Sequence, residues 1–415
     1  MWWPCSTVGA PRGSPPRSKQ TYFRRGFGLK SDIEGALTAD YHSRVVDRIR
    51  AQGYVLTMGD LTFKLAREFG FCYGVDRAVE YAYETRTKFP ERRVFLVGEI
   101  IHNPHVNKKL QSMGVEFLHR PDEGEFDFRG ITPADVVILP AFGVTVKDFE
   151  RLRAVGCVLV DTTCGSVLNV WKRVDSYAKD GFTAVVHGKY YHEETKATSS
   201  QVTKYPGGKY LVVRDMAEAR EVCAYIEGAG SGERFLELFA DKLSPGFDPD
   251  RDLVRVGVAN QTTMLSGESL AIAAEIRRSM AQRYGEAALP EHFRTFDTIC
   301  SATQDRQDAV LKLIAEPLDL MVVIGGYNSS NTTHLAAICH DKAPTYHIED
   351  ASCIDPEAGT IRFRPPGATQ ERRVSGWLPA GPLTVGVTAG ASTPNNKIGE
   401  TVERIAAARG VSLLR

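Results

Sequence analysis

The sequence predicts an α/β protein that carries its candidate functional residues at the ends of parallel strands. Short continuous apolar segments, typical of buried strands, alternate with longer segments of helical periodicity. The length of 415 residues suits two or three domains, because a domain usually has about 100–200 residues. Three cysteines also repeat one local position, a corner between a strand and a helix.

Eight apolar segments predict the strands. They are "RVFLVGEII", "DVVILPAFG", "CVLVDTTC", "FTAVVHG", "KYLVV", "LVRVGVAN", "LMVVIGG" and "LTVGVTAG". Between them, "SVLNVWKRVDSYAKD" and "QDRQDAVLKLIAE" predict helices. Ordered structure is expected to begin near the helix-like "DYHSRVVDRIRAQG". Residues 228–253 and the segment "RFRPPGATQERRVSGW" are expected to be surface excursions.

The composition is that of an ordinary globular protein, with 43% hydrophobic and 25% charged residues. Lys plus Arg and Asp plus Glu both number 51, so the charge gives no indication of a nucleic-acid partner. No apolar run reaches the roughly 18 residues of a membrane span, and we expect no membrane partner. No secretory signal is visible, which favours a cytoplasmic protein with reduced thiols.

The N-terminal end of the chain has an unusual charge pattern. Its first 31 residues contain no Asp or Glu but six Lys and Arg residues, together with Pro and Ser. We expect residues 1–58 to form a partly disordered extension. A disordered tail, or a start codon assigned too early, is favoured over a short organellar transit segment that would lead to the plastid stroma.

Three of the eight cysteines share a sequence context of strand or turn, cysteine and helix. They are Cys72 in "FGFCYGVDRAV", Cys164 in "DTTCGSVLNV" and Cys300 in "DTICSATQDRQ". Their separations of 92 and 136 residues indicate one cysteine for each structural lobe. Ligands of open α/β sheets bind outside the carboxyl ends of the strands, so lobes facing one centre would bring the thiols together.

The expected lobes follow the N-terminal extension. They comprise residues 59–163 with Cys72, residues 164–289 with Cys164, and residues 290–415 with Cys300 and the C-terminal segment. The remaining cysteines of this region lie in periodic apolar patterns or polar loops. They are expected to act as small packed side chains, and they are Cys157, Cys223, Cys339 and Cys353.

Three thiolates suit two kinds of metal group. Catalytic zinc takes three protein ligands and a water molecule. A 4Fe–4S cluster with only three thiolate ligands leaves one iron free to act on a substrate oxygen. The sequence pattern alone leaves both open.

Polar side chains follow several of the expected strands, where a site is expected. These residues are His102, Asn103, His192, Glu194, Thr262, Thr263, Ser329, Ser330, Asn331 and Ser392. The stretch "GGYNSSNTT" precedes a helix, and its N–H groups and hydroxyls suit an anion such as a diphosphate. The alternative for this stretch is a simple helix N-cap. Glu194 suits a general acid in an enclosed site, and its alternative is a solvated surface carboxylate.

The motifs occur together in a known order. They are "FGFCYGVDRAV", "GEIIHNP", "DTTC", "HEET", "NQTTM", "DTICSATQDRQ", "NSSNT" and "GVTAGASTP". With these motifs, residues from about 61 to 410 resemble the LytB family of 4-hydroxy-3-methylbut-2-enyl diphosphate reductases. The segments "PAFG" and "HGKYYHEETKATSS" are similar to its longer cyanobacterial and plastid branch.

The resemblance implies a three-lobed trefoil of α/β domains with a pseudo-threefold arrangement around a 4Fe–4S cluster. It implies that Cys72, Cys164 and Cys300 hold the cluster and leave one iron open to the substrate. The residues it implies for the substrate diphosphate are His102, His192, Ser329, Ser330, Asn331 and Ser392. Glu194 would supply the proton, and Thr263 would order the proton network at the substrate hydroxyl.

The implied reaction is a two-electron reductive dehydroxylation that gives isopentenyl and dimethylallyl diphosphate, the last step of the methylerythritol phosphate route. Ferredoxin or flavodoxin would supply the electrons. Two other hypotheses stay open at this point: a non-redox, aconitase-like hydro-lyase, and a non-catalytic iron–sulfur sensor or phosphate-binding module. One departure from the family pattern is Phe142, which stands where many relatives have a histidine.

Overall fold

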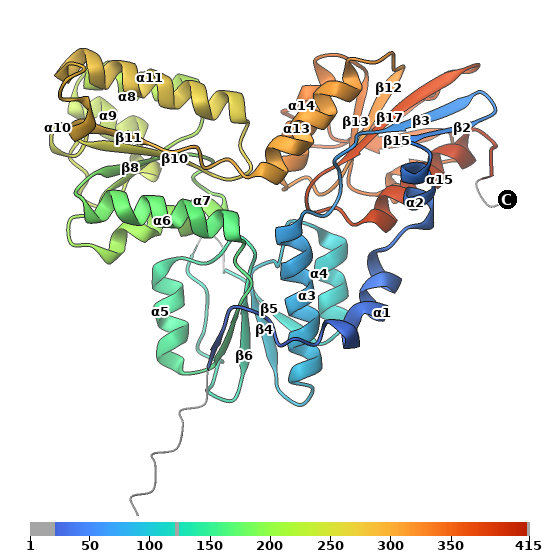
Figure 1. Cartoon of the computed structure of the whole chain (residues 1–415), viewed down its shortest axis with the longest axis horizontal. Coiled ribbons are helices and arrows are strands. Elements are labelled where there is room, and N and C mark those ends of the chain that lie inside the picture. The colour runs from blue at the N-terminus through green and yellow to red at the C-terminus, as the bar shows by residue number, and fades with distance from the viewer. Residues whose placement is uncertain (1–20, 121–123, 413–415) are drawn as a thin grey trace, which may run out of the picture.

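The computed structural model describes residues 21–120 and 124–412, which form three α/β lobes that meet at the centre of the molecule (Figure 1). Each lobe contains one mainly parallel sheet, and a small antiparallel sheet joins the third lobe. The predicted α/β class is therefore confirmed. Within the described residues, no helix is both long enough and apolar enough to cross a membrane.

The first lobe is built on a five-stranded parallel sheet. Its strand order is β1 (Tyr22–Phe23), β7 (Val158–Asp161), β6 (Val136–Leu139), β4 (Val94–Val97) and β5 (Val115–Leu118). Its helices are α1 (Lys30–Tyr41), α3 (Tyr73–Lys88), α4 (Pro104–Ser112) and α5 (Val146–Val155). Every residue of β4, β6 and β7 is buried, because helices cover parallel sheets on both faces.

The second lobe has a four-stranded parallel sheet. Its strand order is β11 (Phe293–Thr295), β10 (Val256–Asn260), β8 (Thr183–His187) and β9 (Tyr210–Val213). Its helices are α6 (Gly165–Lys179), α7 (Glu193–Ser199), α8 (Met216–Ile226), α9 (Gly232–Leu238), α10 (Pro249–Asp252), α11 (Ser266–Tyr284) and α12 (Leu289–His292).

The third lobe combines the C-terminal part of the chain with two N-terminal strands. Its sheet order is β13 (Thr345–Ile348), β12 (Leu320–Ile324), β17 (Leu383–Ala389), β3 (Leu61–Leu65) and β2 (Val55–Met58). Its helices are α2 (Arg44–Ala51), α13 (Ser301–Ile314), α14 (Ser330–His340) and α15 (Asn395–Ala408). The small antiparallel sheet comprises β14 (Ile354–Asp355), β15 (Thr360–Phe363) and β16 (Arg372–Ser375).

Each of the eight segments expected to form strands contains a strand, but the N-terminal region differs from expectation. Ordered structure begins well before "DYHSRVVDRIRAQG", because β1 pairs with β7 and α1 lies beside α3. The buried carboxylate of Glu84 holds this segment by accepting hydrogen bonds from the backbone of Phe27 and Leu29. Residues 1–20, which form most of the N-terminal segment without acidic residues, lie outside the described residues.

The sheets also divide the chain differently from the expected lobe bounds. Strand β3 pairs in parallel with β17, so residues 55–65 belong to the third lobe although they precede Cys72. At the other boundary, β11 pairs with β10 and extends the second lobe to residue 295. Both differences come from pairings between distant parts of the chain.

The two segments expected to be surface excursions take part in the packing. Within residues 228–253, three aromatic side chains are buried in the core of the second lobe, and they are Phe235, Phe239 and Phe247. Burying a large apolar side chain contributes about 1.5–3 kcal/mol, so this segment stabilises the lobe. The segment "RFRPPGATQERRVSGW" contains most of the hairpin of β15 and β16, and its last residue, Trp377, is buried.

Candidate functional site

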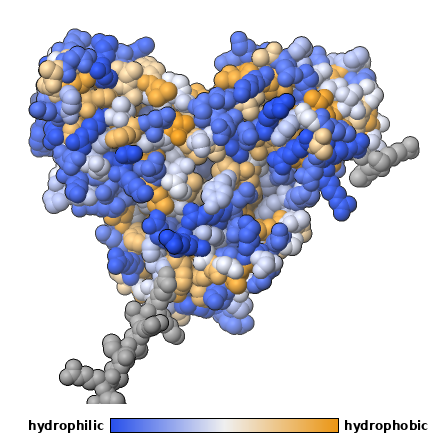
Figure 2. All heavy atoms as spheres, viewed as in Figure 1, coloured by the Kyte–Doolittle hydropathy of each residue, from blue (hydrophilic) through white to orange (hydrophobic). Residues whose placement is uncertain are grey.

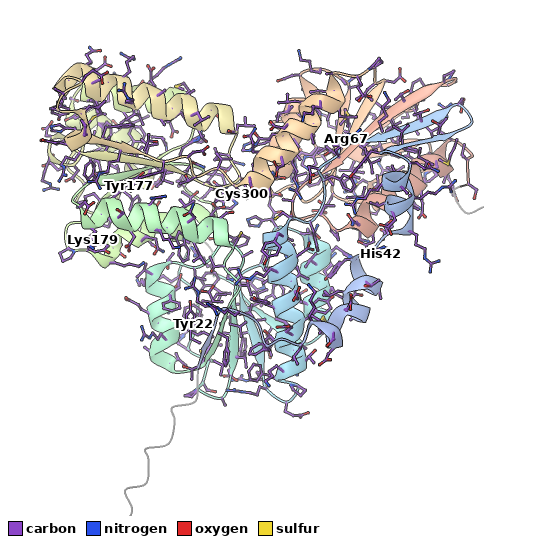
Figure 3. The ribbon with its side chains drawn as sticks, in the orientation of Figure 1. Tyr22, His42, Arg67, Tyr177, Lys179 and Cys300 are labelled. Atoms are coloured by element: carbon purple, nitrogen blue, oxygen red, sulfur yellow. The ribbon has the colours of Figure 1, made fainter. Side chains whose placement is uncertain are left out.

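The three repeated cysteines hold the same structural position in the three lobes. Cys72, Cys164 and Cys300 are the N-cap residues of α3, α6 and α13, with extended backbone and no capping bond from the thiol. Figure 3 shows Cys300 near the middle of the molecule, where the lobes meet. The three thiols therefore occupy equivalent positions at the N-termini of helices.

The backbone around the cysteines repeats as well. The N–H of Cys72 donates to the carbonyl of Ala391, that of Cys164 to Ala141, and that of Cys300 to Thr262. Each acceptor lies two residues after a strand, namely β17, β6 or β10. Those strands pair in parallel with β3, β7 and β11, the strands that precede the cysteines. The three corners are therefore equivalent by hydrogen bonding.

The sulfur atoms face one another across a small space. The position that a Cβ would take at Gly74 is 2.5 Å from the sulfur of Cys164 and 3.9 Å from the sulfur of Cys72. Ser166 lies two residues after Cys164, and its hydroxyl donates to the sulfur of Cys300 at 3.3 Å. Burial raises the pKa of the Cys72 and Cys164 thiols, so these groups are protonated unless a metal group or a cation binds them.

One cavity contains the predicted site residues of all three lobes. Its lining includes Cys72, Cys164, Cys300, His102, His192, Glu194, Thr263, Ser329, Ser330, Asn331 and Ser392. Apolar side chains complete the wall and include Ile101, Ala141, Phe142, Val167 and Ala391. The structure thus brings together the residues implied for the cluster, the diphosphate and the proton, whereas Asn103 caps helix α4 and does not line the cavity. Within the described residues, no three His, Cys, Asp or Glu side chains are close enough to hold a single metal ion.

Glu194 is a buried carboxyl group rather than a solvated one. It lies in the first turn of α7 with 3% of its surface exposed, and its Oε1 accepts the backbone N–H of Thr262 at 2.6 Å. Burial raises the pKa of Glu194 to about 7, although the Thr262 hydrogen bonds oppose this shift. A carboxyl group with such a pKa can hold and release a proton near neutral pH.

The anion-binding features lie at the start of α14 and in the loop after β17. Ser329 is the N-cap of α14, so the expected cap exists, and Ser330 and Asn331 begin the helix. The Asn331 Oδ1 accepts the N–H of Ala391 at 2.9 Å, whereas its buried Nδ2 has no partner in the described part of the chain. Ser392 donates to the carbonyl of His102 at 3.2 Å. The amide group and the helix N-terminus therefore point donors into the cavity.

Two further residues organise the site without having been singled out in the sequence. Gln261 is fully buried, and its Nε2 donates to the hydroxyls of Thr263 at 2.9 Å and Ser330 at 3.3 Å. Glu99 lies 3.0 Å from Nδ1 of His102. Both residues lie inside motifs quoted above, "NQTTM" and "GEIIHNP". Their positions in these motifs are the signal that could have identified them from the sequence.

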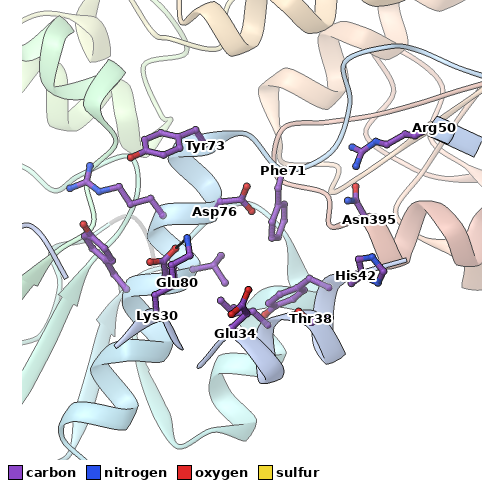
Figure 4. A pocket seen from close by; sticks show the side chains of 15 residues that line it. Lys30, Glu34, Thr38, His42, Arg50, Phe71, Tyr73, Asp76, Glu80 and Asn395 are labelled. Atoms are coloured by element: carbon purple, nitrogen blue, oxygen red, sulfur yellow. Dashed lines mark hydrogen bonds and ion pairs between the residues drawn. The ribbon is translucent and has the colours of Figure 1, made fainter. Parts of the chain in front are cut away.

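A second hollow lies at the surface along α1 and α3 (Figure 4). It is lined largely by charged and aromatic side chains, and Lys30 there pairs with Glu80 at 3.1 Å. None of the predicted site residues is among the described residues that line it. Figure 2 shows one face of the whole molecule, and hydrophilic residues cover much of it. The central cavity is therefore the candidate site.

Comparison with known proteins decides the family. The family model described as LytB protein matches residues 63–406. A protein of Thermosynechococcus vestitus named 4-hydroxy-3-methylbut-2-enyl diphosphate reductase is 51% identical over 397 residues, which cover 95% of this chain and 96% of that protein. The chain belongs to the LytB family. The resemblance expected from its motifs is confirmed.

Further proteins are similar to this chain in sequence or in fold. A Gloeobacter violaceus protein of the same name is 50% identical, with 94% of each chain covered. A solved structure of (E)-4-hydroxy-3-methyl-but-2-enyl diphosphate reductase, described as the terminal enzyme of the non-mevalonate pathway, matches with a TM-score of 0.51 and 29% identity. The match covers 83% of this chain and 98% of that one. A reductase structure from Plasmodium falciparum, with a TM-score of 0.60, 21% identity and coverage of 83% and 87%, shares the fold.

Proposed function

We propose that this LytB protein reduces (E)-4-hydroxy-3-methylbut-2-enyl diphosphate to isopentenyl and dimethylallyl diphosphate. The reaction consumes two electrons and two protons, breaks the allylic C–O bond and releases the hydroxyl oxygen as water. The observation that carries the proposal is the convergence of three thiols, a buried carboxyl group and an anion-binding helix start on one cavity. The names of two similar relatives support it.

We infer that Cys72, Cys164 and Cys300 hold a 4Fe–4S cluster, because thiolates are the usual protein ligands of such clusters. The fit rests on the three equivalent corners and on Gly74, which leaves space between the sulfurs of two lobes. Among the described residues, no three such side chains are close enough to bind one metal ion. A group bound by all three thiols must therefore be larger than a single ion. When bound, such a cluster supplies electrons and Lewis acidity for the removal of a hydroxyl group.

The proton for the leaving water comes from Glu194 in this proposal. A hydroxide ion is a poor leaving group, so proton delivery in the same step lowers the barrier. Thr263 lines the same cavity, and its hydroxyl accepts an N–H of Gln261 at 2.9 Å. The hydroxyl proton of Thr263 is therefore free to point toward the substrate hydroxyl, which fixes the direction of the proton network.

The diphosphate binds at the opposite end of the cavity. Burial holds the pKa of His192 well below its usual range, so His192 is neutral and donates through one ring nitrogen. The start of α14 adds backbone N–H groups, and the unpartnered Nδ2 of Asn331 adds a further donor. These groups orient the allylic alcohol away from the phosphates and toward the thiols.

The apolar wall excludes water around the reacting carbon. Phe142, Ile101 and Val167 line the same cavity as the thiols and the polar residues. In a dry site, charge–dipole interactions are stronger and reactive intermediates are protected from side reactions. The electrons come from an external donor, for which the family resemblance suggests ferredoxin or flavodoxin.

The proposal is tested with protein purified without oxygen and mixed with a chemically reduced viologen dye. We expect substrate-dependent oxidation of two dye equivalents for each product molecule, with both diphosphate products detected. Turnover of the substrate without consumption of reductant would overturn the proposal and favour a hydro-lyase. Cys157→Ser is the matched control, because Cys157 is buried away from the cavity and should leave turnover unchanged.

A further inference from the structure

Four groups from two lobes form a hydrogen-bonded chain at the anion end of the cavity. The Oε2 of Glu99 is 3.0 Å from Nδ1 of His102. The Nε2 of His102 is 3.2 Å from Nε2 of His192, and the two rings are nearly perpendicular. The Nδ1 of His192 accepts the backbone N–H of Glu194 at 3.1 Å. Both histidines line the cavity.

The hydrogen bonds at the two ends of this network determine which ring nitrogens carry the protons. Because Nδ1 of His192 accepts an N–H, the proton of this neutral ring is on Nε2. That proton is donated to Nε2 of His102, which must therefore be the acceptor. The ring of His102 then carries its proton on Nδ1 and donates it to Glu99. Every donor in the chain meets an acceptor.

An anion that enters between the two rings breaks this arrangement. His192 already presents an N–H to the anion, but His102 presents a bare nitrogen that repels it. His102 becomes a donor when it gains a second proton, on Nε2. The carboxylate of Glu99 and the face of Phe142, which stacks on the ring at 4.6 Å, both stabilise the resulting imidazolium.

We propose that diphosphate binding takes up one proton at His102 and that Glu99 is the positioning residue that makes this uptake possible. The inference rests on the proposed function, since it assigns the anion end of that site. Phe142 supports the same positive charge from the face of the His102 ring.

The other groups around His102 do not supply this effect. Asn328, just before α14, donates to Glu99 at 3.2 Å and keeps its carboxylate oriented. Glu194 also interacts with His102, but burial raises its pKa to about 7, so it is only partly ionised near neutral pH. Variants at Glu99 keep Glu194 unchanged and therefore isolate the contribution of Glu99. Lys189 and Lys196 act on His192, where they oppose a positive charge. Glu99 is thus the nearest carboxylate with solvent access that supports a cation at this ring.

The test is calorimetric titration of the cluster-loaded enzyme with inorganic diphosphate at pH 8, in buffers of different ionisation enthalpy. We expect uptake of about one proton by the wild type, and affinity that rises about tenfold for each pH unit lowered where His102 is neutral in the free enzyme. Glu99→Gln should abolish most of the uptake and weaken binding at pH 7 by about tenfold, with unchanged iron content. Glu99→Asp should restore part of both.

Glu116→Gln, on the exposed side of β5, is the matched control and should behave as wild type. Unchanged proton uptake in Glu99→Gln, or no uptake or no diphosphate binding in the wild type, would overturn the inference. The result of this titration can be distinguished from the result of the test of reductase activity. Diphosphate binding with proton uptake but without dye oxidation would leave the inference standing and reject the reductase activity.

Discussion

At the scale of single residues, burial determines the chemistry of the cavity. Glu194 and His192 stand two residues apart at the start of α7, and burial moves both toward their neutral forms. The neutral acid is a proton donor and the neutral imidazole is a hydrogen-bond donor, so one physical effect prepares both groups. On the surface, the same residues would be a charged carboxylate and a partly charged imidazole.

The raised pKa of Glu194 predicts a pH dependence of catalysis. The proton is present below a pKa of about 7 and is lost as the pH rises through it, so kcat should fall on the alkaline side of neutrality. Glu194→Gln should lower kcat by about 10²–10⁴-fold and remove this limb of the profile. Steady-state kinetics from pH 6 to 9 measure both effects. The adjacent, half-exposed Glu193, replaced by Gln, should retain the wild-type profile.

At the scale of elements, the first turn of each cysteine-bearing helix controls access to the thiols. Helix α3 carries Gly74 in that turn, facing the sulfur of Cys164, whereas α6 begins with Gly165, which faces open space. The helix starts are thus equivalent in hydrogen bonding but differ in how closely another lobe approaches. Only the first of them needs glycine for close approach.

This difference predicts unequal effects of two small substitutions. Gly74→Ala would place a methyl group 2.5 Å from the Cys164 sulfur and should lower the bound iron severely. Gly165→Ala meets no atom within 4 Å and should retain wild-type iron content. Colorimetric iron analysis of both variants after identical anaerobic purification gives the comparison. Equal iron content in the two would show that the lobes do not approach as described.

The segment of residues 228–253 predicts a stability effect far from the cavity. Phe239 is fully buried in the second lobe, so Phe239→Ala should lower the free energy of unfolding by about 3–5 kcal/mol. Leu238 is its neighbour with 42% of its surface exposed, and Leu238→Ala should cost less than about 1 kcal/mol. Denaturant unfolding measures both. A Phe239→Ala variant as stable as wild type would show that residues 228–253 form a surface excursion, as the sequence predicted.

At the scale of the whole molecule, three lobes supply one site, and this explains what the sequence could predict. The strands were predictable because buried apolar runs and the turns after them are local signals. The cysteine corners were predictable because their context is repeated three times. The convergence of Cys72, Cys164 and Cys300 then follows from a general property of α/β sheets.

The parts that sequence reasoning missed depend on distant contacts. The membership of β3 in the third lobe comes from its pairing with β17, more than 300 residues away. The proposed role of Glu99 depends on the ring of His102 in its own lobe, whose Nε2 meets His192 of another lobe. The two-residue strand β1 has no periodicity to detect, and its place is fixed by β7. No window of local sequence contains such information.

The most direct test of the account is the iron and sulfide content of the anaerobically purified protein and its cysteine variants. We expect about four iron and four sulfide ions per chain in the wild type and in Cys157→Ser. Replacement of Cys72, Cys164 or Cys300 by Ser should each remove most of both. One zinc ion per chain, or full iron content in any of the three variants, would contradict the account.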